Sequence, residues 1–137
     1  KIGLSDILSG SNSIDDVVKN TEIENLDFIS RGQIPPNPSE LLMNANFKKL
    51  MDWATENYEL VIIDTPPILA VSDACIAAKY AGTIMLVARF QKNTLKEIEV
   101  AAKRFEQNKL NVSGVIFNGV EKRTANYYEY GAYNYYE

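Results

Sequence analysis

Apolar and polar residues alternate along the chain in a way that predicts a mixed α/β fold. Three short runs rich in Val and Ile, at 60–63, 83–88 and 112–117, have the pattern of strands buried on both faces of a parallel sheet. Helical patterns separate these runs. The alternation implies right-handed crossovers and a three-layer sheet, in which ligands bind beyond the carboxyl ends of the strands. Residues at those ends are therefore candidates for a functional site.

Two helices are predicted between the three runs. The first begins at Ser72 or Asp73, either of which can cap it. The second begins at Thr94, which forms a capping box with Glu97, and ends near Asn108. These helices would serve as the crossover connections of the parallel sheet.

The first half of the chain predicts shorter elements. Residues 3–10 form a short helix with Ser5 as its cap and Gly10 as its stop, and 14–19 form another turn of helix. Residues 26–30 alternate as a short strand does. We therefore expect two helical turns and one strand before the first proline.

A loop with three prolines follows at 31–38, since prolines prevent regular structure there. Asn37 then resembles a helix cap, with Pro38 at the first helical position and Glu40 able to reach back. A second helical stretch, at 47–58, repeats apolar residues every three or four positions. It is expected to bury Phe47, Leu50, Met51, Ala54 and Tyr58 and to expose Lys48, Lys49 and Asp52.

Composition is typical of one soluble globular domain: of 137 residues, 46% are hydrophobic and 23% charged. The net charge of −4, without a basic stripe, argues against a nucleic-acid partner. The absence of histidine excludes a histidine general base, a serine triad and the usual zinc sites. The single cysteine, Cys75, cannot form a disulfide within the chain and is expected to fill the core.

No apolar run approaches the roughly 20 residues that span a bilayer, so the chain by itself is expected to be soluble and cytoplasmic. It opens at Lys1, without an initiator methionine and directly in a structured-looking segment. This opening suggests that more protein normally precedes it.

The segment 120–137 differs from the domain expected at 1–119. It lacks apolar periodicity, so we interpret it as a flexible tail. Exposed phenols are good phosphate acceptors, whereas tyrosine-rich tails also serve as adhesive interaction segments. Six tyrosines are the candidate acceptors: Tyr127, Tyr128, Tyr130, Tyr133, Tyr135 and Tyr136.

Four residues at predicted strand ends could carry chemistry. Asp64 ends the run 60–63, where a carboxylate can hold hydrated Mg²⁺ beside nucleotide phosphates or form a structural turn equally well. Asn118 can read an adenine edge or simply form a turn. Arg31 and Arg89 end two further strands, where guanidinium groups could bind phosphate or remain solvated.

Taken together, these segments resemble the bacterial tyrosine kinases attached to capsule and exopolysaccharide export. The resemblance covers essentially the whole chain and rests most specifically on the proline loop and the tyrosine tail. The matching segments are Gly-Leu-Ser-Asp-Ile-Leu-Ser-Gly at 3–10, Arg-Gly-Gln-Ile-Pro-Pro-Asn-Pro-Ser-Glu-Leu-Leu at 31–42, Val-Ile-Ile-Asp-Thr-Pro-Pro at 61–67, Val-Ser-Asp-Ala at 71–74, Asn-Gly-Val at 118–120, and the tail.

The resemblance implies a fold like that of the septum-site and partition ATPases, with ATP and Mg²⁺ as cofactors. ATP would donate its γ-phosphate to the tail tyrosines. Asp64 matches the Walker B aspartate, Asn118 looks like the base-contacting asparagine, and Arg31 looks like the loop arginine that can meet a phosphorylated tyrosine. By the same resemblance, subunits form a ring and phosphorylate one another, at the cytoplasmic side of the inner membrane. The partners would be a tyrosine phosphatase and the polysaccharide export machinery.

The chain departs from the family in one respect, because no Gly-x-x-x-x-Gly-Lys-Ser/Thr loop and no second aspartate-bearing strand occur in it. We therefore expect the C-terminal part of such a kinase domain, incomplete at its N-terminus and inactive by itself. Two other functions stay open at this point. One is a partition-type switch ATPase, which needs no acceptor tyrosines, and the other is a catalytically inactive binding module.

Overall fold

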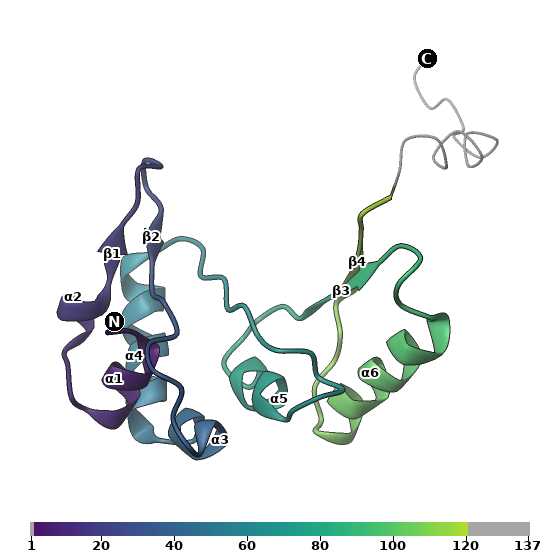
Figure 1. The fold of residues 1–137 in the computed structure, drawn as a ribbon, viewed down its shortest axis with the longest axis horizontal. Helices are drawn as coiled ribbons and strands as arrows, with labels where there is room; N and C mark the ends of the chain where they lie inside the picture. Colours follow the sequence, from purple (N-terminus) through teal and green to yellow (C-terminus); the bar gives the residue numbers. More distant parts are fainter. Residues whose placement is uncertain (1, 121–137) are drawn as a thin grey trace. The chain divides into compact units, whose positions relative to one another are not determined.

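Short helices and strands make up the computed structural model, which describes residues 2–120 (Figure 1). The described residues fall into two compact units, one that ends at Gly82 and one that begins at Thr83, and each is described by itself. The first unit contains α1 (Leu4–Ser9), α2 (Ile14–Val17), β1 (Lys19–Asn20), β2 (Asp27–Phe28), α3 (Pro38–Leu42), α4 (Ala45–Asn57) and α5 (Asp73–Ala78). The second contains β3 (Met85–Arg89), α6 (Leu95–Gln107) and β4 (Gly114–Asn118). Residues 121–137 of the predicted flexible tail, which include its six tyrosines, lie outside the described residues.

The core of the first unit forms where α4 packs against α1. Phe47 and Leu50 of α4 are 2% and 3% exposed, and they meet Ile7 and Leu8 of α1. The ring of Phe47 also contacts the ring of Tyr80 edge to face, with centroids 5.1 Å apart. The predicted buried face of the helix is confirmed at Phe47, Leu50 and Ala54.

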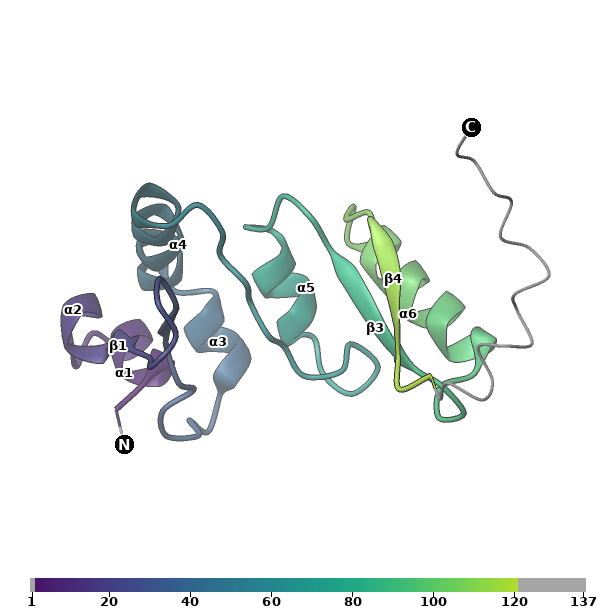
Figure 2. The same ribbon diagram turned by 90° about the horizontal axis from the view of Figure 1, so that it is seen from above.

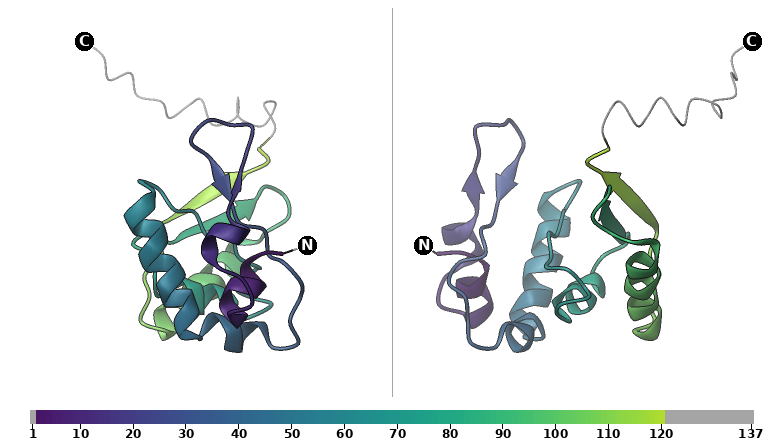
Figure 3. Two further views of the ribbon diagram at one scale, coloured as in Figure 1. Left: turned by 90° about the vertical axis from the view of Figure 1, so that its left-hand side faces the viewer. Right: turned by 45° about the vertical axis from the view of Figure 1, so that its right-hand side comes forward.

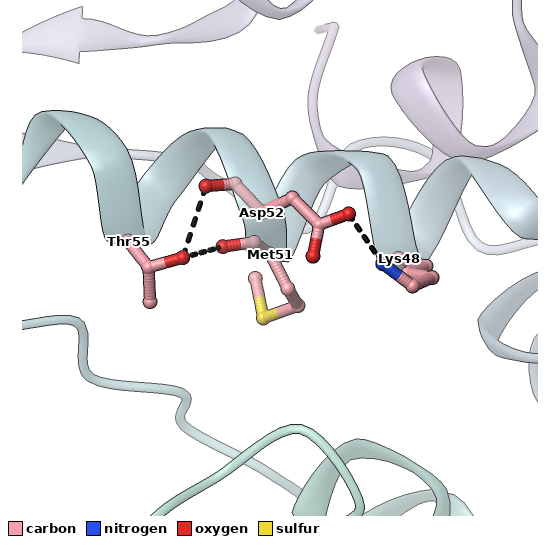
Figure 4. Close-up of polar contacts among 4 residues, drawn as sticks. All are labelled: Lys48, Met51, Asp52 and Thr55. Atoms are coloured by element: carbon pink, nitrogen blue, oxygen red, sulfur yellow. Dashed lines mark hydrogen bonds and ion pairs between the residues drawn. The ribbon is translucent and has the colours of Figure 1, made fainter.

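The opposite face of α4 is polar, as the pattern predicted. Lys48 and Asp52 are exposed and form an ion pair of 2.5 Å at the i,i+4 spacing (Figure 4). The hydrogen bond to Asp52 raises the pKa of Lys48. The Thr55 hydroxyl donates to the carbonyl oxygens of Met51 and Asp52. This face of α4 therefore offers charged surface positions that do not touch the core.

The caps in the first unit match the prediction in part. Gly10 adopts φ 79° and ends α1, as expected, but the residue before the helix is Gly3, so the prediction of Ser5 as the cap was wrong. Asn37 precedes α3 and Pro38 opens it. The side chain of Asn37 makes no capping bond to the helix backbone, and its amide donates to Glu40 instead.

A small antiparallel hairpin replaces the longer strand predicted at 26–30. Only Asp27–Phe28 is a strand, and it pairs with Lys19–Asn20, which the pattern had not suggested. The hairpin extends away from α1 and α2 (Figure 3). Asp27 ties it to the end of α4, because Tyr58 donates to the carboxylate at 2.6 Å and this hydrogen bond raises the pKa of Tyr58.

The second unit is a parallel β3–α6–β4 motif, so the predicted strand–helix–strand order is confirmed here. Arg89 of β3 is the register partner of Asn118 of β4. Helix α6 lies alongside the two strands (Figure 2). It begins with the predicted capping box, in which Thr94 accepts from the Glu97 amide while Glu97 accepts from the Thr94 amide. The hydrogen bond from the Thr94 backbone lowers the pKa of Glu97.

The prediction that all three apolar runs are strands buried on both faces was wrong. The run 60–63 forms neither a helix nor a paired strand, and Leu60 and Ile62 are 75% and 81% exposed. In β3 only one face is covered: Ala88 is 2% exposed, whereas Val87 is 64% exposed. A parallel strand is buried on both sides only when it has strand neighbours and helices on both faces, and the described residues pair two parallel strands only.

Within residues 2–120, no helix combines the length and the apolar character that crossing a bilayer requires. Cys75 is buried in α5, as expected for a residue that fills the core.

Candidate functional site

Asp64 is presented by an extended segment held at two points. Ile63, immediately before it, packs against the core of the first unit, and Ile68, four residues after it, is 7% exposed. Between these anchors the carboxylate of Asp64 is exposed. Beyond them, the amide of Ala70 donates to the Pro67 carbonyl at 2.9 Å and turns the chain toward α5. The sequence thus places a carboxylate at the end of an apolar run, as predicted, although the run is not a strand.

Arg31 lies in a loop that is bonded to the first turn of α1. The amide of Leu4 donates to the Ser30 carbonyl at 2.7 Å, and the amide of Ser5 donates to the Arg31 carbonyl at 3.1 Å. These amides belong to the first turn of a helix, where backbone donors lack partners within the helix. The backbone of Arg31 is therefore fixed on both sides while its side chain is exposed.

Two of the motifs quoted from the sequence meet in the first unit. The hydroxyl of Ser39, in the segment 31–42, donates to the carboxylate of Asp73, in the segment 71–74, at 2.7 Å. Both residues are half-buried and join α3 to α5. Sequence reasoning had considered Asp73 only as a helix cap. Both segments were recognisable as motifs in the sequence. Their spacing gave no indication that the two segments contact each other.

Replacing Ser39 tests this link. We expect Ser39→Ala to lower the free energy of unfolding by about 1.5–3 kcal/mol, because the mutation removes a hydrogen bond to a charged group. The exposed Ser9 hydroxyl, which donates to the Asp6 carbonyl, offers a matched control. Ser9→Ala should stay within about 0.5 kcal/mol of wild type. Equilibrium urea unfolding of both variants measures the difference, and equal losses would mean that the Ser39–Asp73 bond adds no stability.

In the second unit, Asn118 and Arg89 lie side by side at the carboxyl ends of the two parallel strands. The Asn118 side-chain oxygen accepts from the Gly119 amide at 2.8 Å, so its amide nitrogen can still donate. A Cβ atom on Gly119 would lie 3.5 Å from Cγ of Arg89, which places the arginine stem along this turn. Arg89 and Asn118 therefore share one edge of the two-stranded sheet.

The four predicted residues do not form one described site. Asp64 and Arg31 lie in the first unit, whereas Asn118 and Arg89 lie in the second. The six tail tyrosines lie outside the described residues. The roles of these residues therefore stay predictions, and the structure contributes their local geometry.

Comparison with known proteins shows the family to which the chain belongs. No family model matches the chain. The chain is 54% identical over 133 residues to "Tyrosine-protein kinase wzc" of Salmonella typhimurium and 56% identical over 131 residues to "Putative tyrosine-protein kinase AmsA" of Erwinia amylovora. These matches cover 97% and 95% of the chain and 18% of each relative. The solved kinase domain of Escherichia coli tyrosine kinase ETK superposes with a TM-score of 0.85 at 46% identity.

The chain belongs to the bacterial tyrosine kinases. The family resemblance inferred from the motifs is thereby confirmed. The superposition covers 98% of this chain and 51% of the ETK kinase domain, so the chain spans about half of a solved tyrosine-kinase domain. A mixed α/β fold with a parallel strand pair agrees with this relationship.

Proposed function

We propose that the protein carrying this chain is an ATP-dependent protein-tyrosine kinase that phosphorylates its own tyrosine cluster, at Tyr127, Tyr128, Tyr130, Tyr133, Tyr135 and Tyr136. The observation that carries the proposal is the match of nearly the whole chain to tyrosine kinases at more than half identity. We also propose that the complete domain has the three-layer fold of a phosphate-loop NTPase. The likeness to a solved kinase domain supports it.

The chemistry of Asp64 fits a magnesium ion shared with nucleotide phosphates. No group of three or more acidic, cysteine or histidine side chains that could hold a metal occurs in the described part of the chain. Mg²⁺ commonly takes only one or two protein carboxylates and completes its shell with phosphate oxygens and water. A single exposed carboxylate between the half-buried Ile63 and the buried Ile68 therefore suits this ion, which would neutralise charge on the phosphates during transfer.

The chain supplies part of the nucleotide site. Asp64 would hold the metal, Asn118 would contact the base, and Arg31 would meet phosphate groups with its guanidinium. The cradle of backbone amides formed by a glycine-rich phosphate loop has no counterpart in the 137 residues. We propose accordingly that these 137 residues do not transfer phosphate when they are separated from such a loop.

The partners in this proposal are other copies of the kinase, a tyrosine phosphatase and the polysaccharide export machinery. Neighbouring subunits would form a ring in which each tail reaches the active site of the next subunit. Phosphorylation adds about −1.5 to −2 charges per tyrosine. Repulsion among several such groups would open the ring, and this would regulate capsule or exopolysaccharide synthesis at the inner membrane.

Removing the tail tests the proposal. In the complete protein, deletion of 126–137 should remove most of the phosphotyrosine formed with ATP and magnesium, and it should change the size of the oligomer. ATP turnover should remain, because the nucleotide contacts lie before the tail. Phosphotyrosine formation is measured with radiolabelled ATP and oligomer size by light scattering.

Replacing all six tail tyrosines by phenylalanine provides the control, because it keeps the length and aromatic character of the tail. It should abolish tail labelling as the deletion does. If the complete protein turns over ATP but forms no phosphotyrosine, and the deletion leaves oligomer size unchanged, the kinase proposal is wrong and a partition-type ATPase fits better.

A further inference from the structure

The loop that carries Arg31 approaches α1 more closely than any side chain would permit. A Cβ atom on Gly3 would lie 2.2 Å from the backbone nitrogen of Gly32 and 2.3 Å from the Ser30 carbonyl oxygen. Real Cβ atoms essentially never come that close, and the atoms in the way belong to the backbone. Gly3 is itself buried. The contact therefore requires glycine at position 3.

Gly32, the partner of Gly3 in this contact, is restricted to glycine as well. It adopts φ +82°, in the left-handed region that favours glycine. A Cβ atom there would lie 2.4 Å from the Ser5 hydroxyl and 3.0 Å from the Asp6 carboxylate. Two glycines, 29 positions apart in sequence, thus meet at the N-terminus of α1 and at the residue that follows Arg31.

Hydrogen bonds complete this arrangement around Arg31. Its carbonyl accepts from Ser5 at 3.1 Å, and the preceding carbonyl accepts from Leu4 at 2.7 Å. The Ser30 hydroxyl donates to the Ile2 carbonyl at 3.2 Å. A capping side chain would satisfy the helix amides equally well. What the glycine contact adds is a fixed backbone on both sides of an exposed arginine.

We propose that the Gly3–Gly32 contact positions Arg31 for phosphate transfer, so that these glycines act on the reaction through the arginine. The inference rests on the proposed kinase function. If the loop lifts from α1, the guanidinium moves while its charge is unchanged. A displacement of about 1 Å can cost about 100-fold in rate when the displaced group orients the reactants.

The test uses Gly32→Ala in the complete protein, with Gly10→Ala as its matched control. Gly10 adopts the same left-handed conformation, φ +79°, but a Cβ atom there would meet nothing closer than 3.6 Å. Both variants carry the backbone strain of alanine in this conformation, and only Gly32→Ala adds the collision. We expect Gly32→Ala to lower the rate of tail phosphorylation about tenfold or more, and Gly10→Ala to stay within about twofold.

A double-mutant cycle separates positioning from a general loss of fold. We expect Gly32→Ala to have no further effect on the rate in an Arg31→Ala background, because the group that it misplaces is already absent. Amide exchange over residues 2–10 should still accelerate in both backgrounds. Adding Ser5→Ala to Gly32→Ala removes the nearest clashing atom and should restore part of the rate.

Each other outcome rejects the inference in a recognisable way. An equal fall in rate in the wild-type and Arg31→Ala backgrounds means that the contact only supports the fold. Tail labelling that is unchanged in Arg31→Ala but abolished in Asp64→Asn would mean that the arginine has no role in the transfer. The proposed kinase function would stand in that case. Unaltered labelling by Asp64→Asn removes the proposed function itself.

Discussion

Replacing Asp64 by Asn is expected to reduce tail phosphorylation by about 100- to 1000-fold. Asparagine keeps the size and one oxygen of the side chain but removes the negative charge that holds the metal. Stabilisation of the phosphates by a bound metal contributes several kcal/mol to such a transfer, and each 1.36 kcal/mol is a tenfold change in rate. Phosphate incorporation from radiolabelled ATP into the complete protein, across a range of magnesium concentrations, measures the effect.

Stability should not change in the same variant, because Asp64 is exposed. Asp52→Asn is the matched control: Asp52 is also an exposed aspartate of the first unit, and it pairs with Lys48 on the polar face of α4 (Figure 4). An exposed ion pair of this kind contributes little to stability because water and salt screen it. Asp52→Asn should therefore keep full activity. A similar loss in both variants would show that removing any surface charge from this unit is harmful, and Asp64 would lose its special role.

Helical elements were predictable from the sequence because their signals are local. Thr94 and Glu97 are three residues apart, and that spacing alone defines the capping box that opens α6. The apolar positions Phe47, Leu50 and Ala54 likewise fix the buried face of α4 through the helical period. In both places the interacting groups lie within one or two turns of each other.

Strand predictions failed where the outcome depends on distant partners. The run 60–63 has the composition of a buried strand, yet Leu60 and Ile62 are exposed because no strand in the described residues pairs with them. A high content of Val and Ile indicates that a segment suits a pleated, buried surface. It does not indicate that neighbouring strands and helices are present to bury the segment. The same reasoning explains Val87, whose face of β3 is open.

In the candidate site, too, individual residues were predictable from the sequence and contacts between distant segments were not. Asp64, Arg31 and Asn118 could be selected from sequence because each polar residue ends an apolar run or begins a loop. The bond between Ser39 and Asp73 and the contact between Gly3 and Gly32 join segments about 30 residues apart. Such pairs leave no periodic trace in a single sequence, and they became visible only in three dimensions.

Phe47→Ala is expected to cost about 3–5 kcal/mol of folding free energy. The ring is 2% exposed and packs with Ile7, Leu8 and the ring of Tyr80, so its removal leaves a cavity that rigid helices cannot close. Domains are commonly stable by only about 5–15 kcal/mol, so this loss takes a large share of the total. The single tryptophan of the chain, Trp53, packs against the same core, and its fluorescence reports urea unfolding there.

Phe28→Ala removes the same ring from the hairpin, where it is 58% exposed, and provides the control. It should cost less than about 1 kcal/mol, because most of the ring already contacts water. The two substitutions are chemically identical and differ chiefly in how deeply the ring is buried, so the difference between them mainly reflects packing. Equal shifts of the urea midpoint would mean that α1 and α4 do not form the stabilising core of the first unit. A much larger shift for Phe47→Ala would locate that core where α4 meets α1, beside the contact that holds Arg31.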